Sequence, residues 1–269
     1  MSSTNEIPPV RALEAVEGAY LKAIAEATPV GVRERLGMTA AAVGDGTVLA
    51  LRDDGHALFN RASGFGEPVT EEVLDRIIEV FRAAGASSAT LKFAPSVVPA
   101  GLGAARGLTP QPATVKVVRA AGRVPGAPTG LRVGPVSAED EERWLRVVLD
   151  PFDEPPPLLG DVLGATFRHR GSRRFGAWDG DELVACGVLF VDGPTGVLKS
   201  GATIASRRSR GAQSALIAAR VAAAAEAGCR WVVSETAAPE PGRRVTSLDN
   251  LLRAGFVHAY DYVNLRWER

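Results

Sequence analysis

The sequence has few cysteines and no long hydrophobic run. Its 269 residues include two cysteines, Cys186 and Cys229, which are too few for a disulfide framework or for a metal site made of cysteine alone. No apolar segment approaches the ~20 residues that a membrane-spanning helix needs. The N-terminus lacks the charged and then apolar pattern of a secretory signal. We therefore expect a cytoplasmic protein without a membrane partner, in which both thiols are buried.

The chain also lacks net charge. Thirty-one acidic residues balance 31 basic residues, and the isoelectric point is near 6.9. This balance argues against nucleic acid as a partner of the whole chain. Only four of the 31 basic residues are lysines, and the rest are arginines. Because arginine is so common in this chain, a single arginine is weak evidence for a functional site. Hydrophobic residues make up 46% of the chain and charged residues 23%, which is typical of globular proteins and excludes a disordered chain.

A stretch rich in glycine and proline divides the chain. Residues 119–130, RAAGRVPGAPTG, show no apolar periodicity and are typical of a linker. We predict one domain at 1–120, a linker at 121–130 and a second domain at 131–269. Both halves repeat an order of helix, glycine, strand and proline, with Gly85 and Gly228 in matching places. This order predicts an α+β fold with two domains, each a mostly antiparallel sheet flanked by helices.

Apolar periodicity and turn residues predict the individual elements. We expect helices at 11–26, 71–84, 138–149, 158–167 and 211–227, and one that opens near Thr246. We expect strands at 38–43, 47–52, 56–60, 90–93, 113–118, 131–133, 173–178, 182–191, 197–204 and 230–234, and one or two within 256–267.

The loop before the longest helix of the second half carries the clearest motif. Its residues are Arg208, Ser209, Arg210, Gly211, Ala212 and Gln213. A helix start presents backbone N–H groups and favours anions, and glycine lets a phosphate approach the backbone closely. The motif therefore indicates a pyrophosphate site. The alternative is an ordinary helix start with solvated arginines.

The order of elements around this motif resembles the GNAT family of acyl-CoA N-acyltransferases. The family signature is Gln/Arg-x-x-Gly-x-Gly/Ala, and here it begins at Arg208 and departs at Gln213. Ala227-Gly-Cys229 and Arg253-Ala-Gly-Phe256 follow in the expected order. The resemblance covers residues 131–269 and implies acetyl-CoA as co-substrate and direct attack of an amine on its thioester. The three histidines, His56, His169 and His258, show no ligand spacing, so we expect no metal.

The resemblance also implies which residues hold acetyl-CoA. The preceding strand would pair with the pantetheine arm and polarise the thioester carbonyl, and the loop and first helical turn would bind the pyrophosphate. A further residue, Asn250, is expected to cap a helix or to contact the cofactor. The implied cofactor-binding residues are Gly201, Ala202, Thr203, Arg208, Ser209, Arg210, Gly211, Ala212, Gln213, Ser214 and Asn250.

The acid and base are less well marked. Many family members carry a tyrosine where this chain has Leu251, which cannot donate a proton. The substitutes are Ser247, Asn250, Tyr260 and Tyr262. We predict Tyr260 as the acid and Glu235, just past a strand end, as the base. The alternatives are a tyrosine that packs in the core and a solvated carboxylate.

The first half contains an echo of the motif at residues 61–66, RASGFG. Glu67 and Pro68 follow, and the helix is expected to begin only near Thr70, so the loop amides need not lie on the helix start. Glu67 would also repel a phosphate. We predict that this half is a degenerate GNAT-like domain whose loop is structural.

We thus expect an N-acetyltransferase that acts on a small-molecule amine. An acidic turn with Asp150, Asp153 and Glu154 is a candidate to attract that amine, or a solvated loop. One alternative is an acyl-CoA-binding or regulatory module that has lost catalysis. Another is a ligase-type enzyme with a larger acyl or aminoacyl donor, against which the neutral charge argues. The sequence leaves open whether the protein is a monomer or a homodimer.

Overall fold

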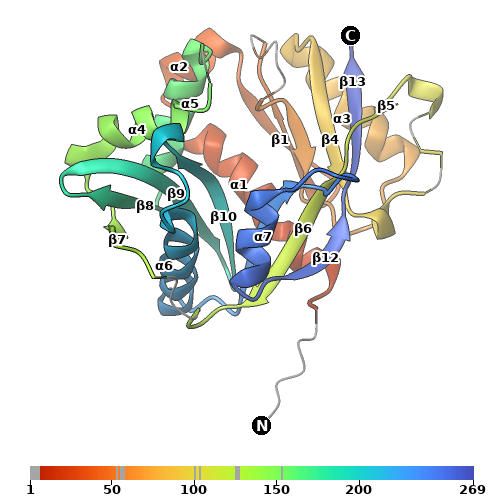
Figure 1. The fold of residues 1–269 in the computed structure, drawn as a ribbon. Coiled ribbons are helices and arrows are strands. Elements are labelled where there is room, and N and C mark those ends of the chain that lie inside the picture. Colours follow the sequence, from red (N-terminus) through yellow and green to blue (C-terminus); the bar gives the residue numbers. More distant parts are fainter. Residues whose placement is uncertain are drawn as a thin grey trace. The chain divides into compact units, whose positions relative to one another are not determined.

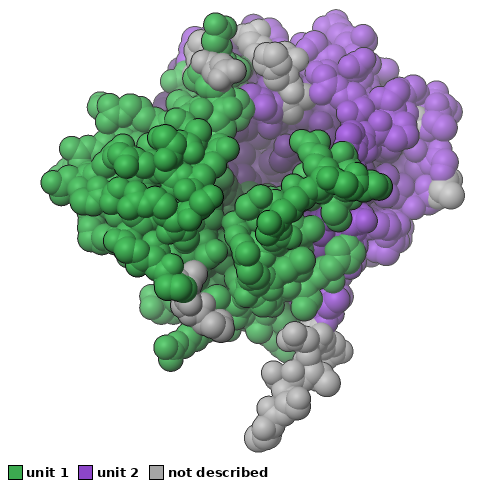
Figure 2. Space-filling view, in the orientation of Figure 1, with its two compact units in different colours: residues 1–5, 117–258 green, residues 6–116, 259–269 purple. Residues whose placement is uncertain are grey.

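The chain folds into two units, which Figure 2 distinguishes by colour. The computed structural model describes residues 7–52, 54, 58–99, 101–102, 104–124, 128–152 and 154–269. Unit 1 contains residues 117–258, and unit 2 contains residues 6–116 and 259–269. Each unit is built around one sheet with helices packed on it (Figure 1).

Unit 2 holds a six-stranded sheet in the order β1-β2-β3-β4-β13-β5. The pair β3–β4 is parallel, and the other pairs are antiparallel. The elements are α1 (Val10–Ala27), α2 (Val30–Leu36), β1 (Thr39–Val43), β2 (Gly46–Ala50), β3 (Arg61–Ser63), α3 (Glu71–Ala84), β4 (Ser88–Phe93), β5 (Thr109–Pro110) and β13 (Val263–Glu268).

Unit 1 contains most of a seven-stranded sheet in the order β12-β6-β11-β10-β9-β8-β7. Its pairs from β7 to β10 are antiparallel, and β10–β11 is parallel. The elements are β7 (Arg132–Pro135), α4 (Glu141–Leu149), α5 (Pro157–Arg168), β8 (Ser172–Asp179), β9 (Glu182–Asp192), β10 (Thr195–Thr203), α6 (Ala212–Glu226), β11 (Trp231–Ala237) and α7 (Thr246–Arg253). Two further strands of this sheet, β6 (Thr114–Ala120) and β12 (Val257–Asp261), have residues in both units. Two mostly antiparallel sheets flanked by helices confirm the predicted fold class.

The last strand belongs to unit 2. β13 pairs with β4 along its whole length, and Trp267 stacks on Phe81 of α3 with ring centroids 5.8 Å apart. Trp267 is 2% exposed and is part of the core of unit 2. The sequence predicted that all of 131–269 forms the second domain, whereas the structure places β13, at the end of that range, in the sheet of unit 2. Apolar alternation identifies a strand, but it does not identify the strand's partner.

One predicted strand is replaced by a turn. Strand β3 lies at Arg61–Ser63 rather than at 56–60, of which residues 56 and 57 lie outside the described chain. The buried carboxylate of Asp54 accepts the backbone N–H groups of Leu58, Phe59 and Asn60 at 2.9, 2.6 and 2.7 Å. Because these groups donate to a side chain, they are unavailable to a strand ladder.

In unit 1, apolar packing fixes α4 and α6 against the sheet. Trp144 of α4 is fully buried, and its indole N–H donates to the carbonyl of Phe175 on β8 at 3.2 Å. Leu216 and Val221 of α6 are also fully buried. The first turn of α6 is therefore held at the end of β10, where the motif lies.

Candidate cofactor site of unit 1

The strands β10 and β11 separate at their carboxyl ends. In the described chain, their parallel ladder ends at the pair Leu198–Ser234, whereas β10 continues to Thr203 and β11 to Ala237. We call residues 199–203 and 235–237 the strand fork. A strand edge that its neighbour has left can pair with an extended ligand through backbone hydrogen bonds.

A bulge in β10 lies at the fork. The register against β9 shifts between Lys199 and Ala202, and Ser200 has a φ of 50°. Among the described residues, Ser200 and Ser209 are the two non-glycine residues with a left-handed backbone. Such conformations cost energy and cluster at functional sites. Ser209 is among the residues that the resemblance assigns to the cofactor, and Ser200 directly precedes Gly201, the first of them.

The buried side chain of Arg220 holds the bulge. Its Nη1 donates to the carbonyls of Lys199 and Val188 at 3.3 Å each, and its Nε donates to Leu216 at 3.0 Å. The described residues provide no acidic partner for it, and burial lowers its pKa to about 10. The guanidinium thus remains charged at neutral pH and satisfies carbonyls that the irregular ladder frees. Sequence reasoning missed this residue because it resembles any arginine on a helix.

The loop before α6 has the geometry of an anion site. Ser209 and Gly211 are left-handed, with φ of 65° and 80°. The first helical hydrogen bond runs from the Ala215 N–H to the Gly211 carbonyl at 3.0 Å, so the amides of residues 212–214 have no acceptor within the helix. Among the described residues, no side chain caps this helix start. Unsatisfied amides, left-handed loop residues and the helix dipole together favour an anion here.

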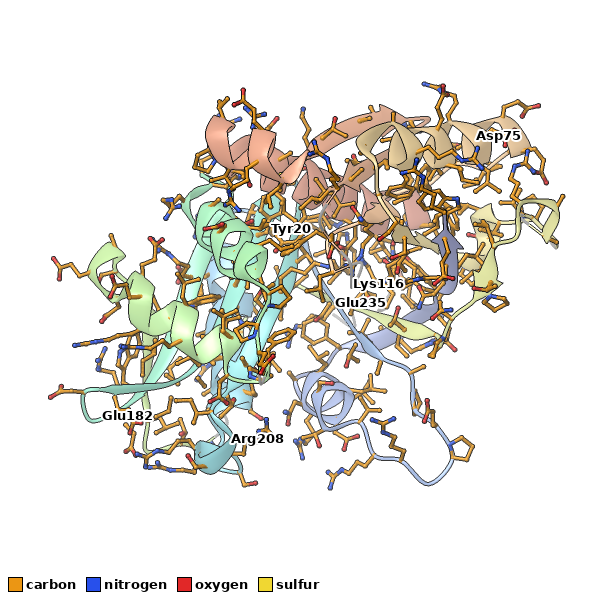
Figure 3. All side chains as sticks on the ribbon, turned by 90° about the horizontal axis from the view of Figure 1, so that it is seen from above. Tyr20, Asp75, Lys116, Glu182, Arg208 and Glu235 are labelled. Atoms are coloured by element: carbon orange, nitrogen blue, oxygen red, sulfur yellow. The ribbon has the colours of Figure 1, made fainter. Side chains whose placement is uncertain are left out.

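Two of the loop arginines have partners within the protein. Arg210 binds Asp179, and Arg207 binds Glu182 and lies 3.5 Å from Asp179. The hydrogen bond with Arg210 lowers the pKa of Asp179 and raises that of Arg210. Arg208, which Figure 3 labels, is exposed, and the ion pairs of the described residues do not include it. An anionic ligand is therefore unnecessary to explain Arg207 and Arg210, and Arg208 is the one best placed to meet it.

Part of the expected linker packs against this loop. The Thr129 hydroxyl donates to the Arg210 carbonyl at 2.9 Å. A Cβ on Gly211 would lie 3.0 Å from the Pro128 carbonyl oxygen, in addition to its left-handed strain. Glycine at 211 is thus required by backbone geometry and by space. Residues 125–127 of the linker lie outside the described chain.

The side chain of Gln213 lies along the end of β10. Its Nε2 donates to the Ala202 carbonyl at 2.7 Å and to the Thr203 hydroxyl at 2.9 Å. Its Oε1 lies 3.1 Å from the point where a Cβ on Gly201 would stand. Gly201, Ala202 and Thr203 are therefore at the fork, as their assignment to the cofactor requires, but a protein amide contacts them.

The proposed base lies at the fork. Glu235, which Figure 3 labels, is half-buried and directly follows Ser234, the last residue of β11 that pairs with β10. A carboxylate there is next to the place where the resemblance puts the thioester. The role of Glu235 as the base thus stays a prediction.

The start of α7 provides hydroxyl groups but no phenol. Leu251 is 5% exposed and packs in the core. The hydroxyls of Ser247 and Thr236 share a hydrogen bond, which places Ser247 beside the end of β11. The side-chain Oδ1 of Asn250 accepts from the guanidinium of Arg253, its neighbour one turn away. Asn250 thus contacts its own helix, and its part in holding the cofactor stays a prediction.

The structure gives Tyr260 a different environment from the one predicted. It belongs to unit 2, where its hydroxyl and that of Tyr262 each donate to Glu14 Oε1 at 2.5 Å. Lys116 is fully buried beside them, with Nζ 2.6 Å from Glu17 and 3.7 Å from Glu14. Burial and the carboxylates raise the pKa of both tyrosines. Tyr260 is therefore part of a buried network of unit 2, and we withdraw it as the acid.

The corresponding loop of unit 2 is already filled by the protein. The carboxylate of Asp45 accepts the Gly66 and Glu67 amides at 3.0 and 3.1 Å, where a phosphate would need them. A Cβ on Gly64 would stand 2.6 Å from Gly18 of α1, so the helix backbone covers the loop. These contacts give the loop a structural role, as the sequence predicted.

The helix starts of the two units also differ. In unit 2, Thr70 caps α3 and accepts the Val73 N–H at 3.3 Å. In unit 1, Gly211 precedes α6 with no side-chain cap among the described residues. Of these two helix starts, α3 has a side-chain cap for one of its first amides, whereas α6 has none among the described residues.

A cavity of about 410 Å³ lies beside the loop in unit 1. Its lining residues are Arg143, Arg146, Val147, Asp150, Asp181, Glu182, Leu183 and Ile204. Asp150 of the expected acidic turn is among them and accepts the Ala205 N–H at 3.2 Å. Glu154 is exposed, and Asp153 lies outside the described residues. The turn is thus engaged in part with the loop after β10.

The remaining expectations concern thiols, metals and membranes. Cys186 and Cys229 are buried free thiols, as predicted, and burial raises the pKa of Cys186 to about 12. Within the described ranges there is no group of three or more residues suited to hold a metal ion. No helix in those ranges is both long and apolar enough to cross a membrane.

Neither a protein-family model nor a curated protein sequence matches the chain. Solved structures do match it. A GCN5-related N-acetyltransferase from Kribbella flavida has a TM-score of 0.61 at 17% identity, over 91% of this chain and 95% of that one. A similar enzyme from Sphaerobacter thermophilus has a TM-score of 0.58 at 17% identity, over 86% and 76%.

A third match contains two such domains. A tandem GNAT protein from the clavulanic acid biosynthesis pathway has a TM-score of 0.57 at 15% identity, over 94% of each chain. Identities this low establish the fold and not the activity. The chain therefore has the tandem GNAT fold that the sequence resemblance implied.

Proposed function

We propose that unit 1 is an N-acyltransferase that uses acetyl-CoA and a primary amine of a small molecule. The observation that carries the proposal is the unsatisfied start of α6 directly beside the strand fork. A loop for a diphosphate and an open strand edge for an amide-bearing arm are the two parts that an acyl-CoA needs. Unit 2 has its loop filled by Asp45, which supports a single cofactor site.

The residues present fit the cofactor. The amides of 212–214, with Ser209 and Gly211, would hold the pyrophosphate, and Arg208 would add positive charge. The backbone of 201–203 would pair with the pantetheine arm. Successive backbone N–H groups in a left-handed loop form a concavity that suits an anion, so the fit rests on the geometry of the loop.

The chemistry requires little more than a base and an oxyanion donor. When bound, the thioester supplies an activated acyl group that an amine attacks directly. Glu235 would accept the proton that the amine loses. Backbone N–H groups at the β10 bulge would stabilise negative charge on the carbonyl oxygen. Since Leu251 is buried in the core, α7 provides no phenol there, and the thiolate leaves without a proton from that position.

A second candidate is an acyl-CoA-binding module without catalysis. The buried Leu251 in place of the family's tyrosine favours it. Both candidates bind acetyl-CoA, but only the enzyme releases free thiol when an amine is added. Glu235→Gln separates them further, because it should retain acetyl-CoA binding and lose thiol release by about 100-fold or more if Glu235 is the base.

Calorimetry with acetyl-CoA tests the site itself. Arg208→Ala should weaken binding about two- to fivefold, as expected for one exposed charge near a phosphate. Arg170→Ala is the matched control, because Arg170 is also exposed in unit 1 and lies before β8. If both variants and the wild-type protein bind acetyl-CoA with equal affinity, Arg208 does not contact the cofactor. If the wild-type protein does not bind acetyl-CoA at all, the proposal is refuted.

A further inference from the structure

The bulge of β10 places two residues, Ser200 and Gly201, opposite a single residue of β9, Gly187. A bulge leaves one residue outside the ladder, so it decides the direction of the Ser200 and Gly201 backbone N–H groups. Both residues lie beyond Leu198, where β11 leaves β10. Their N–H groups are therefore the ones at the bulge that could stabilise charge on a thioester carbonyl.

The side chain of Arg220 occupies the space that Gly187 leaves. A Cβ on Gly187 would stand 2.6 Å from Cζ and Nη1 of Arg220, so the guanidinium lies directly over this glycine. From there Nη1 donates to the carbonyls of Lys199 and Val188, which form the last cross-strand pair before the bulge, at 3.3 Å each. The guanidinium thus holds the beginning of the bulge from the face of the sheet that α6 covers.

Packing of α6 does not account for this arginine. Leu216 and Val221 are fully buried and already fix the helix against the sheet. Arg220 is 3% exposed, and no carboxylate of the residues that the structure describes pairs with it. Burying an unpaired charge costs free energy, and an apolar side chain of similar size would pack over Gly187 at a lower cost. We therefore expect an arginine here only if the carbonyls that it bonds must be held.

We infer that Arg220 is a positioning residue, which fixes the bulge of β10 so that the Ser200 and Gly201 amides are aimed at the thioester carbonyl. The inference rests on the proposed use of acetyl-CoA. Arg220 acts through the backbone of β10 and not by contact with the cofactor. Its loss should therefore reduce the polarisation of the bound thioester much more than the affinity for acetyl-CoA.

Infrared spectroscopy of bound acetyl-CoA, isotope-labelled at the acetyl carbonyl, measures this polarisation without an acceptor amine. The wild-type protein should lower the carbonyl stretching frequency relative to free acetyl-CoA. Arg220→Met removes the guanidinium and keeps an unbranched side chain, and it should lose this frequency shift. Calorimetry should find that its acetyl-CoA affinity falls by less than about tenfold, the range of one net hydrogen bond.

A second variant and a matched control accompany Arg220→Met. Gly187→Ala displaces the guanidinium without removing it, because the new Cβ takes its place, and should lose the frequency shift as well. Arg173→Met is the control, since Arg173 also ties α6 to the sheet but does so from β8, through the Ala223 carbonyl at 3.3 Å. Arg173→Met should keep the shift.

Each other outcome contradicts the inference. A normal frequency shift in Arg220→Met, or in Gly187→Ala if the first variant does not fold, overturns the positioning role and leaves the proposed function. An equal loss in Arg173→Met overturns it too, because any loosening of α6 would then suffice. If neither Arg220→Met nor Gly187→Ala folds, Arg220 is required by the fold itself. If the wild-type protein binds acetyl-CoA without a shift, the bulge does not polarise the thioester. If the wild-type protein does not bind acetyl-CoA, the proposed function fails and the positioning role fails with it.

Discussion

Ser209 offers the sharpest test of the loop, because it can be replaced by two residues, aspartate and asparagine, that have nearly the same shape as each other. Its φ of 65° is left-handed, a conformation that aspartate and asparagine adopt more readily than other side chains. Ser209→Asp and Ser209→Asn therefore fit the same backbone and differ in one negative charge. Gly211 is less suitable, because any Cβ there is strained and lies 3.0 Å from the Pro128 carbonyl.

The expected loss follows from Coulomb's law. A carboxylate about 4 Å from a phosphate charge is repelled by about 1 kcal/mol in bulk water and about 4 kcal/mol at an effective dielectric constant of 20. Acetyl-CoA should therefore bind Ser209→Asp about 5- to 1000-fold more weakly than Ser209→Asn. Calorimetry measures both, and the difference should shrink in 1 M salt, where the screening length falls to about 3 Å.

The same substitution carries its own control for folding. A carboxylate near the start of α6 interacts favourably with the helix dipole, by about 0.3–1 kcal/mol. Thermal unfolding of Ser209→Asp should thus occur at an equal or higher temperature than that of Ser209→Asn. Equal acetyl-CoA affinities for the two variants would refute the loop as the pyrophosphate site.

Three further predictions concern unit 2 and the thiols. Asp45→Ala should lower the free energy of unfolding by only about 1 kcal/mol, since the loop amides that Asp45 bonds are exposed, and it should leave the affinity for acetyl-CoA unchanged. A loss of acetyl-CoA affinity without a loss of stability would show that the cofactor binds unit 2 and not unit 1. Trp267→Ala should lower the free energy of unfolding, measured by chemical denaturation, by about 3–5 kcal/mol. Hydrogen-exchange protection should be lost first in β4 and α3, and a loss of protection confined to β11 would contradict the place of β13 in the sheet of unit 2. Cys186, with its pKa raised to about 12 by burial, should resist alkylation at pH 8 until the protein unfolds, which mass spectrometry detects.

The sequence was informative where local chemistry decides the structure. The left-handed glycines, the caps and the apolar periodicity located α3 at Glu71–Ala84 and the start of α6 within one residue. The motif at Arg208–Gln213 was sufficient to find the loop. These features depend on neighbours in the chain, so a reader of the sequence can evaluate them directly.

Long-range choices could not be predicted in this way. The partner of β13 depends on which sheet can bury Trp267, and the place of Tyr260 depends on a glutamate 246 residues earlier, Glu14. The roles of Arg207 and Arg210 depend on their ion pairs with Asp179 and Glu182. The sequence predicted the two strands on either side of that turn, but not that these acidic residues lie beside the arginines. Pairings between distant segments leave no local pattern.

A crystal structure of the protein with acetyl-CoA tests the central claim most directly. We predict the pyrophosphate on the amides of residues 212–214 and the pantetheine arm along 201–203. Density for the nucleotide at residues 64–67 of unit 2, or outside both loops, would contradict the account.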